Sequence, residues 1–308
     1  MKFFVSGLVN VETNLRVRSF PVTYYPIDYP FFGINTTISG VGYNIATAAK
    51  TLGDDVTFAS LIGRDPEGRR IAREFERIGM DSSLVFDDVE QTPVSVILYE
   101  AGADGRRQIY SDLKDIQQHS LDPNSVIASV QASDVCVLCN SEFNRALLSV
   151  AHAAGKKIAT DVHMLNDIHD EFNADFMRYA DILFLSDEDL PVPPREFLVK
   201  LKKEYAAEII VIGLGEDGAL LYERATDKIT ALDAVDIGGV VNTIGAGDAM
   251  FTAFNHYYLR GEPAVEALKR AEVFAALKIR HDGGAVGFAT EAQVEELYKT
   301  YKFVCVTE

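Results

Sequence analysis

Residues 242–254, NTIGAGDAMFTAF, combine two glycines, an aspartate and an apolar helical pattern in an order that suits chemistry on an anion. Gly245 and Gly247 weaken a helix interior but suit a turn whose bare N–H groups approach a ligand closely. The apolar residues that follow recur at helical spacing, so we expect a helix to begin within this turn. The unsatisfied N–H groups and the positive dipole end of such a helix attract an anion.

Asp248 lies at the start of this expected helix, where an aspartate has two interpretations. As a plain N-terminal charge it stabilises the helix dipole. Beside a bound phosphate it is repelled, unless it has a proton to take. The functional interpretation of Asp248 is therefore a general base next to an anion site.

The composition of the 308 residues excludes several classes of protein. A net charge of −17 leaves no basic stripe for a nucleic acid. No apolar run approaches the length of a membrane span, and the first residues, MKFFVSGLVNVETN, lack the layout of a signal peptide. We therefore expect a cytoplasmic protein that binds neither nucleic acid nor membrane.

Three cysteines fit a reducing compartment. Cys136 and Cys139 form a CxxC pair, but a zinc site needs a second pair of ligands and Cys305 stands alone near the end of the chain. The apolar run around the pair predicts a buried strand in which both cysteines serve as small hydrophobic residues. The histidines show no metal-ligand spacing.

Strand-like runs alternate with amphipathic helical segments along almost the whole chain, beginning with an expected strand over residues 2–11. This alternation predicts βαβ units and a parallel sheet covered by helices on both faces. The end of the chain, from the GAGD turn onward, is predicted to be helical. We expect one α/β domain over residues 1–308.

Two segments interrupt the alternation, at about residues 12–38 and 91–112. The second contains two strand-like runs around 101–105, AGADG, and predicts a hairpin. Together the segments predict a small antiparallel lid over the crevice at the carboxyl ends of the parallel strands. The first segment is rich in aromatic residues, for which packing or a subunit contact is favoured over base stacking. These aromatic residues are Tyr24, Tyr25, Tyr29, Phe31 and Phe32.

Two further glycine-rich stretches need separate interpretations. Residues 213–218, GLGEDG, match the dinucleotide fingerprint, but a strand and not a helix is expected next, which excludes that site. Residues 39–44, SGVGYN, precede a helix. Their glycines allow a ligand to approach, with Asn44 offering a donor and an acceptor, whereas the structural alternative is a helix cap from Ser39 or Asn44.

Taken together, these motifs resemble the ribokinase-like (PfkB-type) carbohydrate kinases over nearly the full chain. The resemblance rests on SGVGYN, on residues 62–68, IGRDPEG, on TPVSV with the GRR of the hairpin, and above all on NTIGAGDAMFTAF. It implies a three-layer α/β/α doubly wound, mostly parallel sheet with a small β lid. It also implies phosphorylation of a sugar or nucleoside hydroxyl by ATP and Mg²⁺, and a homodimer formed through the lid.

Residue by residue, the resemblance assigns roles to the motif positions. Asp248 is the implied catalytic base, and the implied anion hole consists of Gly245, Ala246 and Gly247. The implied substrate-binding residues are Glu12, Gly40, Gly42 and Asn44. The implied nucleotide-binding residues are Ser186, Gly213, Gly215 and Asn242, and Asp189 is implied near the metal.

Four of these positions depart from the family pattern. Asn242 replaces an aspartate, Ser186 and Asp189 replace the asparagine and glutamate of NxxE, and Gly213 replaces a frequent threonine. Because the base and the anion hole are intact, an active sugar kinase is favoured. The alternatives are a nucleoside kinase of the same fold and a kinase-like protein that binds a sugar or nucleotide without turnover. Arg106 and Arg107 either recognise a phosphate or face solvent at the hairpin tip.

The amide of Asn242 predicts a weaker dependence on potassium than in family members with aspartate at this position. The change removes a formal charge that attracts a cation and leaves an acceptor oxygen. Activity measured in potassium, in sodium and in a large organic cation tests this. Strong activation of the wild type by potassium contradicts it, and Asn242→Asp is expected to create such activation.

Overall fold

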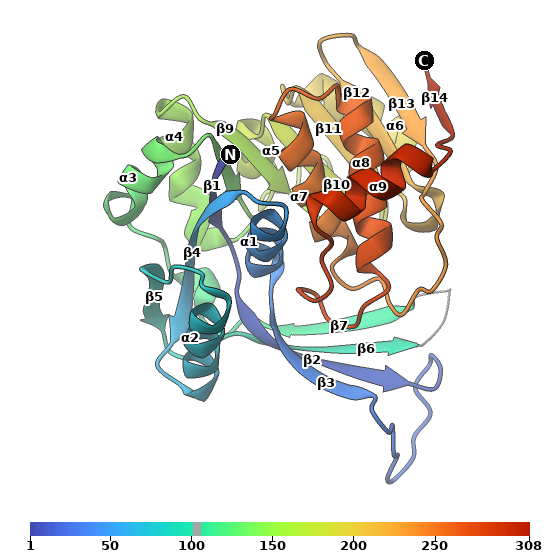
Figure 1. Cartoon of the computed structure of the whole chain (residues 1–308). Coiled ribbons are helices and arrows are strands. Elements are labelled where there is room, and N and C mark those ends of the chain that lie inside the picture. Colours follow the sequence, from blue (N-terminus) through green and yellow to red (C-terminus); the bar gives the residue numbers. More distant parts are fainter. Residues whose placement is uncertain (101–105) are drawn as a thin grey trace.

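The computed structural model describes residues 1–100 and 106–308, and shows a large sheet between two layers of helices with a smaller sheet at one end (Figure 1). The strands of the large sheet are β1 (Lys2–Ser6), β4 (Asp55–Gly63), β5 (Leu84–Val89), β8 (Val135–Leu138), β9 (Lys157–Asp161), β10 (Ile182–Ser186), β11 (Ile209–Gly213), β12 (Ala219–Glu223), β13 (Lys228–Leu232) and β14 (Cys305–Thr307). The strands of the small sheet are β2 (Asn10–Val17), β3 (Ile34–Ser39), β6 (Val94–Glu100) and β7 (Arg107–Asp112).

The helices fall into two groups by the face of the large sheet that they cover. One face is covered by α1 (Val41–Thr51), α2 (Pro66–Ile78), α7 (Ala246–Tyr258), α8 (Ala264–Lys278) and α9 (Glu291–Thr300). The other is covered by α3 (Pro123–Ala132), α4 (Arg145–Ala153), α5 (Ala174–Tyr179) and α6 (Pro194–Glu204). Alternate residues of each buried strand point to opposite faces and pack in two separate cores. Cys136 lies in the core under α3–α6 and Cys139 in the core under α1, α2 and α7–α9. Both thiols are free and buried, which supports their structural interpretation.

The order of the strands places a switch point at β1. The large sheet runs β14-β13-β12-β11-β10-β9-β8-β1-β4-β5, and its pairings are parallel from β5 to β11 and antiparallel from β11 to β14. The chain therefore leaves β1 on one side toward β4 and returns on the other side at β8. Ligands of open α/β sheets bind at the carboxyl ends of the strands beside such a point. The three-layer, doubly wound and mostly parallel architecture is confirmed.

The lid consists of the four strands of the small sheet, in the order β3-β2-β6-β7, and it extends beneath the large sheet in Figure 1. The pairings of β2 with β3 and of β6 with β7 are antiparallel, whereas the central pairing of β2 with β6 is parallel. The β6–β7 hairpin confirms the expected strands on both sides of AGADG. Residues 101–105 themselves lie outside the described residues.

Two expectations differ from the structure. The expected strand over residues 2–11 is two strands in different sheets, because the chain turns at Gly7 and enters the lid at Asn10. The aromatic residues of 24–32 do not pack inside the protein. Phe32 is 99% exposed and Tyr24 is 84% exposed, which contradicts the packing interpretation and leaves a subunit contact open.

A buried charge cluster anchors the far end of α7 to the first residues of the chain. Asp54 accepts hydrogen bonds from the N-terminal ammonium (2.9 Å), from Arg260 Nη2 (2.9 Å) and from His256 Nδ1 (2.6 Å). Burial raises the pKa of Asp54, but the hydrogen bond from His256, the N-terminal ammonium and Arg260 together outweigh it and hold the pKa below its usual range. Because a buried carboxylate without partners is strongly destabilising, this cluster fixes the position of α7.

Candidate functional site

The turn before α7 places a helix N-terminus at the carboxyl end of the large sheet. Gly245 caps the helix with φ 77°, and a Cβ there would come within 2.5 Å of the carbonyl oxygen of Gly284. Only glycine suits both the left-handed backbone and the close approach. At Gly247 a Cβ would meet nothing within 4 Å, so the backbone of the first turn borders open space. The N–H of Ala246 donates to the Thr243 carbonyl (3.2 Å).

A second glycine contact brings the start of α1 toward α7. A Cβ on Gly42 would lie 2.5 Å from the carbonyl carbon of Gly7, so the helix packs directly on the turn that follows β1. The N-cap of α1 is Gly40, with no side-chain cap, so the cap interpretation of Ser39 and Asn44 is wrong. Instead, Ser39 Oγ donates to Asn44 Oδ1 (3.2 Å), and Asn44 Nδ2 donates to Asp248 Oδ2 (2.7 Å).

The carboxylate of Asp248 is therefore held by an amide across two helices. Burial raises the pKa of Asp248, while the nearby His163 and the hydrogen bond from Asn44 act in the opposite direction. The net shift is upward, which makes this carboxylate a stronger base than an exposed aspartate. A raised pKa in a polar crevice is typical of functional sites.

Lys278 places a buried ammonium group beneath the same turn. Its side chain is 0% exposed, and its Nζ donates to the Ile244 carbonyl (3.0 Å), directly before Gly245. Burial lowers the pKa of Lys278 to about 8, although the carboxylates of Asp248, Glu12 and Asp282 favour its charged form. The lysine thus supplies positive charge next to the turn and also holds its backbone.

Glu12 approaches the site from the lid. It lies on β2, opposite Thr37 of β3, and is 6% exposed. Burial raises the pKa of Glu12, against the effect of the Ser39 hydroxyl, and the negative charge of Asp248 raises it further. Glu12, Ser39, Asn44 and Asp248 therefore form one polar cluster between the lid and the two helices.

Asn242 lies beside this cluster and has two hydrogen-bond partners. Its Oδ1 accepts from the Ile244 N–H (3.1 Å), and its Nδ2 donates to Asp282 Oδ1 (2.8 Å). The other oxygen of Asp282 accepts from Asn35 Nδ2 on lid strand β3 (2.6 Å). Asn242 therefore shapes the turn before Gly245 and is connected to the lid through Asp282.

The remaining residues of the sequence-based site follow β10 and β11. Ser186 and Gly213 are paired neighbours at the ends of these strands, and a Cβ on Gly213 would lie 3.1 Å from Met250 Cε of α7. Gly215 has φ 60° and borders open space. Ser186 Oγ accepts from the Glu188 N–H (3.1 Å), and Asp189 Oδ2 accepts from Asn166 Nδ2 (3.3 Å). Of these residues Gly213 lies against α7, and Asp189 has no direct hydrogen bond to the Asp248 cluster among the described residues.

Three residues of the site were missed from the sequence: His163, Lys278 and Asp282. For Arg107 the sequence left two interpretations open, a phosphate ligand or an exposed residue at the hairpin tip, and the structure places this arginine against the main domain. Arg107 begins lid strand β7 and reaches the main domain: its Nη1 donates to Thr243 Oγ1 (2.7 Å) and its Nη2 to Glu188 Oε1 (3.3 Å). Lys278 stands in a helix with ordinary charged neighbours, and the sequence gives no signal that it is buried. Only the fold shows that these residues meet.

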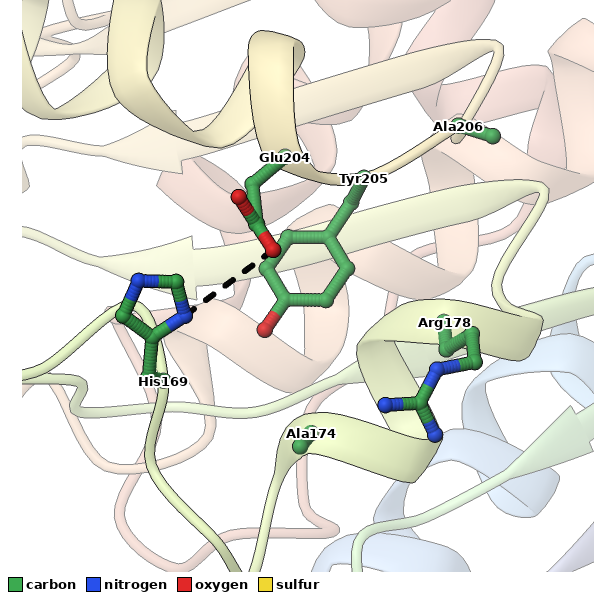
Figure 2. A pocket seen from close by; sticks show the side chains of 6 residues that line it. All are labelled: His169, Ala174, Arg178, Glu204, Tyr205 and Ala206. Atoms are coloured by element: carbon green, nitrogen blue, oxygen red, sulfur yellow. Dashed lines mark ion pairs between the residues drawn. The ribbon is translucent and has the colours of Figure 1, made fainter.

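Figure 2 shows a separate pocket, on the opposite face of the sheet from α7. It is lined by His169, Ala174, Arg178, Glu204, Tyr205 and Ala206. His169 Nδ1 lies 3.9 Å from Glu204 Oε1 across it, and both side chains are largely exposed. The pocket brings no further catalytic group together, so the Asp248 cluster is the candidate site. In the described part of the chain, no three acidic, histidine or cysteine side chains are grouped to hold a metal, and no helix is long and apolar enough to cross a membrane.

Comparisons with known proteins bear on the family and the fold of the chain. Residues 4–291 match the family described as pfkB family carbohydrate kinase. The deoxyribokinase of Salmonella typhi is 26% identical over 96% of this chain and 98% of its own length. The microbiome-derived acarbose kinase Mak1 is 25% identical, with a TM-score of 0.85 over 97% of this chain and 98% of that one. The ribokinase of Arabidopsis thaliana, solved with ribose and ATP, is 19% identical, with a TM-score of 0.77 over 97% and 98% of the two chains.

Because Asn44 donates a hydrogen bond to Asp248, we expect its loss to change the pKa of Asp248. Asn44→Leu removes the donor and puts an apolar side chain in its place, so the pKa of Asp248 is expected to rise further. Carboxyl ¹³C NMR titration, with Asp248→Asn used to assign the signal, measures it. Thr47→Val on the same helix is the control and leaves the titration unchanged. A pKa that falls or stays constant in Asn44→Leu contradicts the role given to this bond.

Proposed function

The chain belongs to the pfkB family of carbohydrate kinases, and we propose that it transfers the γ-phosphoryl group of ATP to a hydroxyl of a small sugar. The observation that carries the proposal is the contact between Asn44 and Asp248 at the glycine-built start of α7. It places a carboxylate of raised pKa beside the backbone N–H groups of a helix N-terminus. A base next to an anion site is what phosphoryl transfer to an alcohol requires.

The proposed reaction uses Asp248 and the turn that precedes it. The substrate hydroxyl lies against Asp248, and its oxygen attacks the γ-phosphorus while Asp248 takes its proton. The bond from the γ-phosphorus to the bridging oxygen breaks, and ADP leaves with that electron pair. The transition state spreads charge over the phosphoryl oxygens, so donors from the Gly245–Gly247 turn and the positive charge of Lys278 stabilise it.

The other residue roles that we propose concern binding. Glu12 and Asn44, beside Gly40 and Gly42, hold substrate hydroxyls. Ser186, Gly213, Gly215 and Asn242 border the nucleotide, and the open backbone at Gly215 and Gly247 suits an approaching polyphosphate. A Mg²⁺ ion carried by ATP would neutralise phosphate charge, and Asp189 is the carboxylate that we propose would help to hold it.

We further propose that the protein is a cytoplasmic homodimer formed through the lid. The outer face of the small sheet exposes Ile34, Val96 and Tyr110, and the loop beside it exposes Tyr29, Phe31 and Phe32. An exposed apolar surface of this kind favours a subunit contact. Sedimentation analysis tests it: a monomer at micromolar concentration contradicts the dimer.

A substrate panel tests the proposed function and its alternatives. Neutral sugars, sugar acids, sugar phosphates and nucleosides are each incubated with ATP and Mg²⁺, and ADP release is measured. Turnover of a sugar supports the proposal, turnover of nucleosides alone supports the nucleoside kinase, and binding without turnover supports a non-catalytic protein. The names of the relatives make deoxyribose, ribose and acarbose the first compounds to assay.

Asp248→Asn is expected to lower kcat by about 10²–10⁴-fold with the best sugar, because an amide cannot accept the hydroxyl proton. Binding of ATP and of the sugar, measured by calorimetry, is expected to change little, since Asn keeps the shape of the side chain. A variant that retains the wild-type kcat contradicts the assignment of Asp248 as the base.

Arg107 is proposed to bring a guanidinium to the transferred phosphoryl group when the lid is closed, because it already contacts Thr243 beside the turn. Arg107→Met is expected to lower kcat by about 10²–10³-fold, the usual effect of removing one transition-state donor. Arg106→Met is the matched control. Arg106 bonds only to Glu100 within the lid among the described contacts, so its loss leaves kcat unchanged. Equal effects of the two variants contradict the proposal.

A further inference from the structure

The inner face of the lid carries a row of buried polar side chains along β2. Asn10, Glu12 and Asn14 alternate with outward-facing residues, so all three point to the same face of the small sheet. They are 2%, 6% and 0% exposed. Buried polar side chains are normally hydrogen-bonded, which makes the partners of this row informative.

Pairing within the row is incomplete and is weakest at Asn14. Asn10 Nδ2 donates to Ser95 Oγ (2.7 Å), which in turn lies 3.1 Å from Ser111 Oγ, whereas Asn10 Oδ1 has no partner among the described residues. Glu12 Oε1 likewise has no hydrogen-bond partner within 3.5 Å in the described part of the chain. At Asn14 neither Oδ1 nor Nδ2 has a partner at that distance within the described chain, although the side chain is fully buried, and its amide lies close enough to Glu12 to lower the pKa of that carboxyl. The Asn14 amide thus makes no hydrogen bond of normal length to the described chain, at a cost in folding free energy.

Asn14 lies on the same strand as Glu12, which is close to the proposed base Asp248. Glu12 is close enough to Asp248 to feel its charge, and Asn14 lies two residues further along the strand, a rise of about 6.6–6.8 Å. In register it faces Asn35 on β3 and Ile97 on β6. Asn35 donates a hydrogen bond to Asp282, which also accepts one from Asn242 beside the turn before Gly245. Asn14 therefore extends the candidate site beyond the residues that the family resemblance implies.

We propose that Asn14 is a specificity-determining residue that binds a hydroxyl or ring oxygen of the substrate at the end remote from the phosphorylated hydroxyl. An amide offers a donor and an acceptor together, which suits a hydroxyl group that needs both. The separation from Glu12 selects a polyhydroxylated substrate with polar groups at both ends, about 7 Å apart. This inference rests on the proposed sugar kinase function.

Asn14→Leu tests the inference because it removes both polar atoms and keeps a side chain of similar size. With the best sugar, kcat/KM is expected to fall by about 5- to 150-fold, the loss expected for one buried hydrogen bond, and to act through KM with kcat nearly unchanged. One monodeoxy analogue of the sugar lacks the hydroxyl that Asn14 binds. With the wild type, kcat/KM for this analogue is expected to be lower than for the parent sugar by the same factor. With Asn14→Leu, kcat/KM is expected to be equal for the analogue and the parent sugar. Asn14→Ser, a smaller change, gives an intermediate loss if Asn14→Leu fails to fold.

Thr13→Val on the outer face of the same strand is the control, since Thr13 Oγ1 is paired with Thr36 Oγ1 (3.1 Å) away from the site. It is expected to leave the kinetics with all analogues unchanged. If Asn14 has a purely structural role, Asn14→Leu changes the denaturation midpoint and lowers kcat/KM equally for every analogue or for none of them. That result overturns the proposal.

Calorimetry of sugar binding without ATP separates this inference from the proposed function. If a sugar binds, is not phosphorylated, and binds more weakly to Asn14→Leu, the kinase proposal fails and the role of Asn14 stands. If the sugar is phosphorylated and Asn14→Leu binds it as tightly as the wild type, the role of Asn14 fails alone. If no sugar binds, both fail.

Discussion

The hydrogen bond from Asn44 to Asp248 joins the two halves of the site, and most of the surrounding structure keeps it at 2.7 Å. Asn44 comes from α1, which follows the lid, and Asp248 comes from α7, more than two hundred residues later. Gly42 lets α1 press against the turn after β1, and Gly245 lets α7 begin against Gly284. The Asp54 cluster fixes the opposite end of α7. A side chain at either glycine displaces a helix and separates the amide from the carboxylate.

The electrostatics of the site follow from this geometry. Burial raises the pKa of both Asp248 and Glu12 and lowers that of Lys278, so each of the three groups is shifted toward its neutral form. Their mutual effects differ in sign: the two carboxylates oppose one another, and Lys278 favours the ionised form of Asp248. A phosphate bound as we propose would add negative charge near Lys278 and near the helix N-terminus, which would favour the charged lysine. The proposed phosphate binding would thus be coupled to the charge state of the groups that surround it.

The sequence predicted those parts of the molecule that depend on local patterns. The alternation of strands and helices, the β6–β7 hairpin, the hairpin after GLGEDG and the start of α7 are each determined by nearby residues and are confirmed. The division of residues 2–11 between two sheets reflects pairings with distant strands, of β1 with β4 and β8 and of β2 with β3 and β6, which the local pattern does not contain. For the same reason Lys278 and Asp282 were missed. Their roles arise from contacts between elements far apart in the chain, and a charged residue in an amphipathic segment has no local sign of burial.

The effect of the departure at Asn242 depends on its contacts in the folded protein. In the sequence alone, the amide in place of the family's aspartate removes a negative charge beside the turn before Gly245. In the structure a carboxylate is still present, since Asp282 lies against Asn242, but both of its oxygens accept hydrogen bonds from amides, one on the turn and one on the lid. The acceptor oxygen of Asn242 is likewise engaged, by the Ile244 N–H. The oxygens of Asn242 and Asp282 are therefore engaged in holding the turn and the lid together. Asp282 connects β3 to the turn before Gly245, so that the position of the lid and the shape of the turn depend on the same carboxylate.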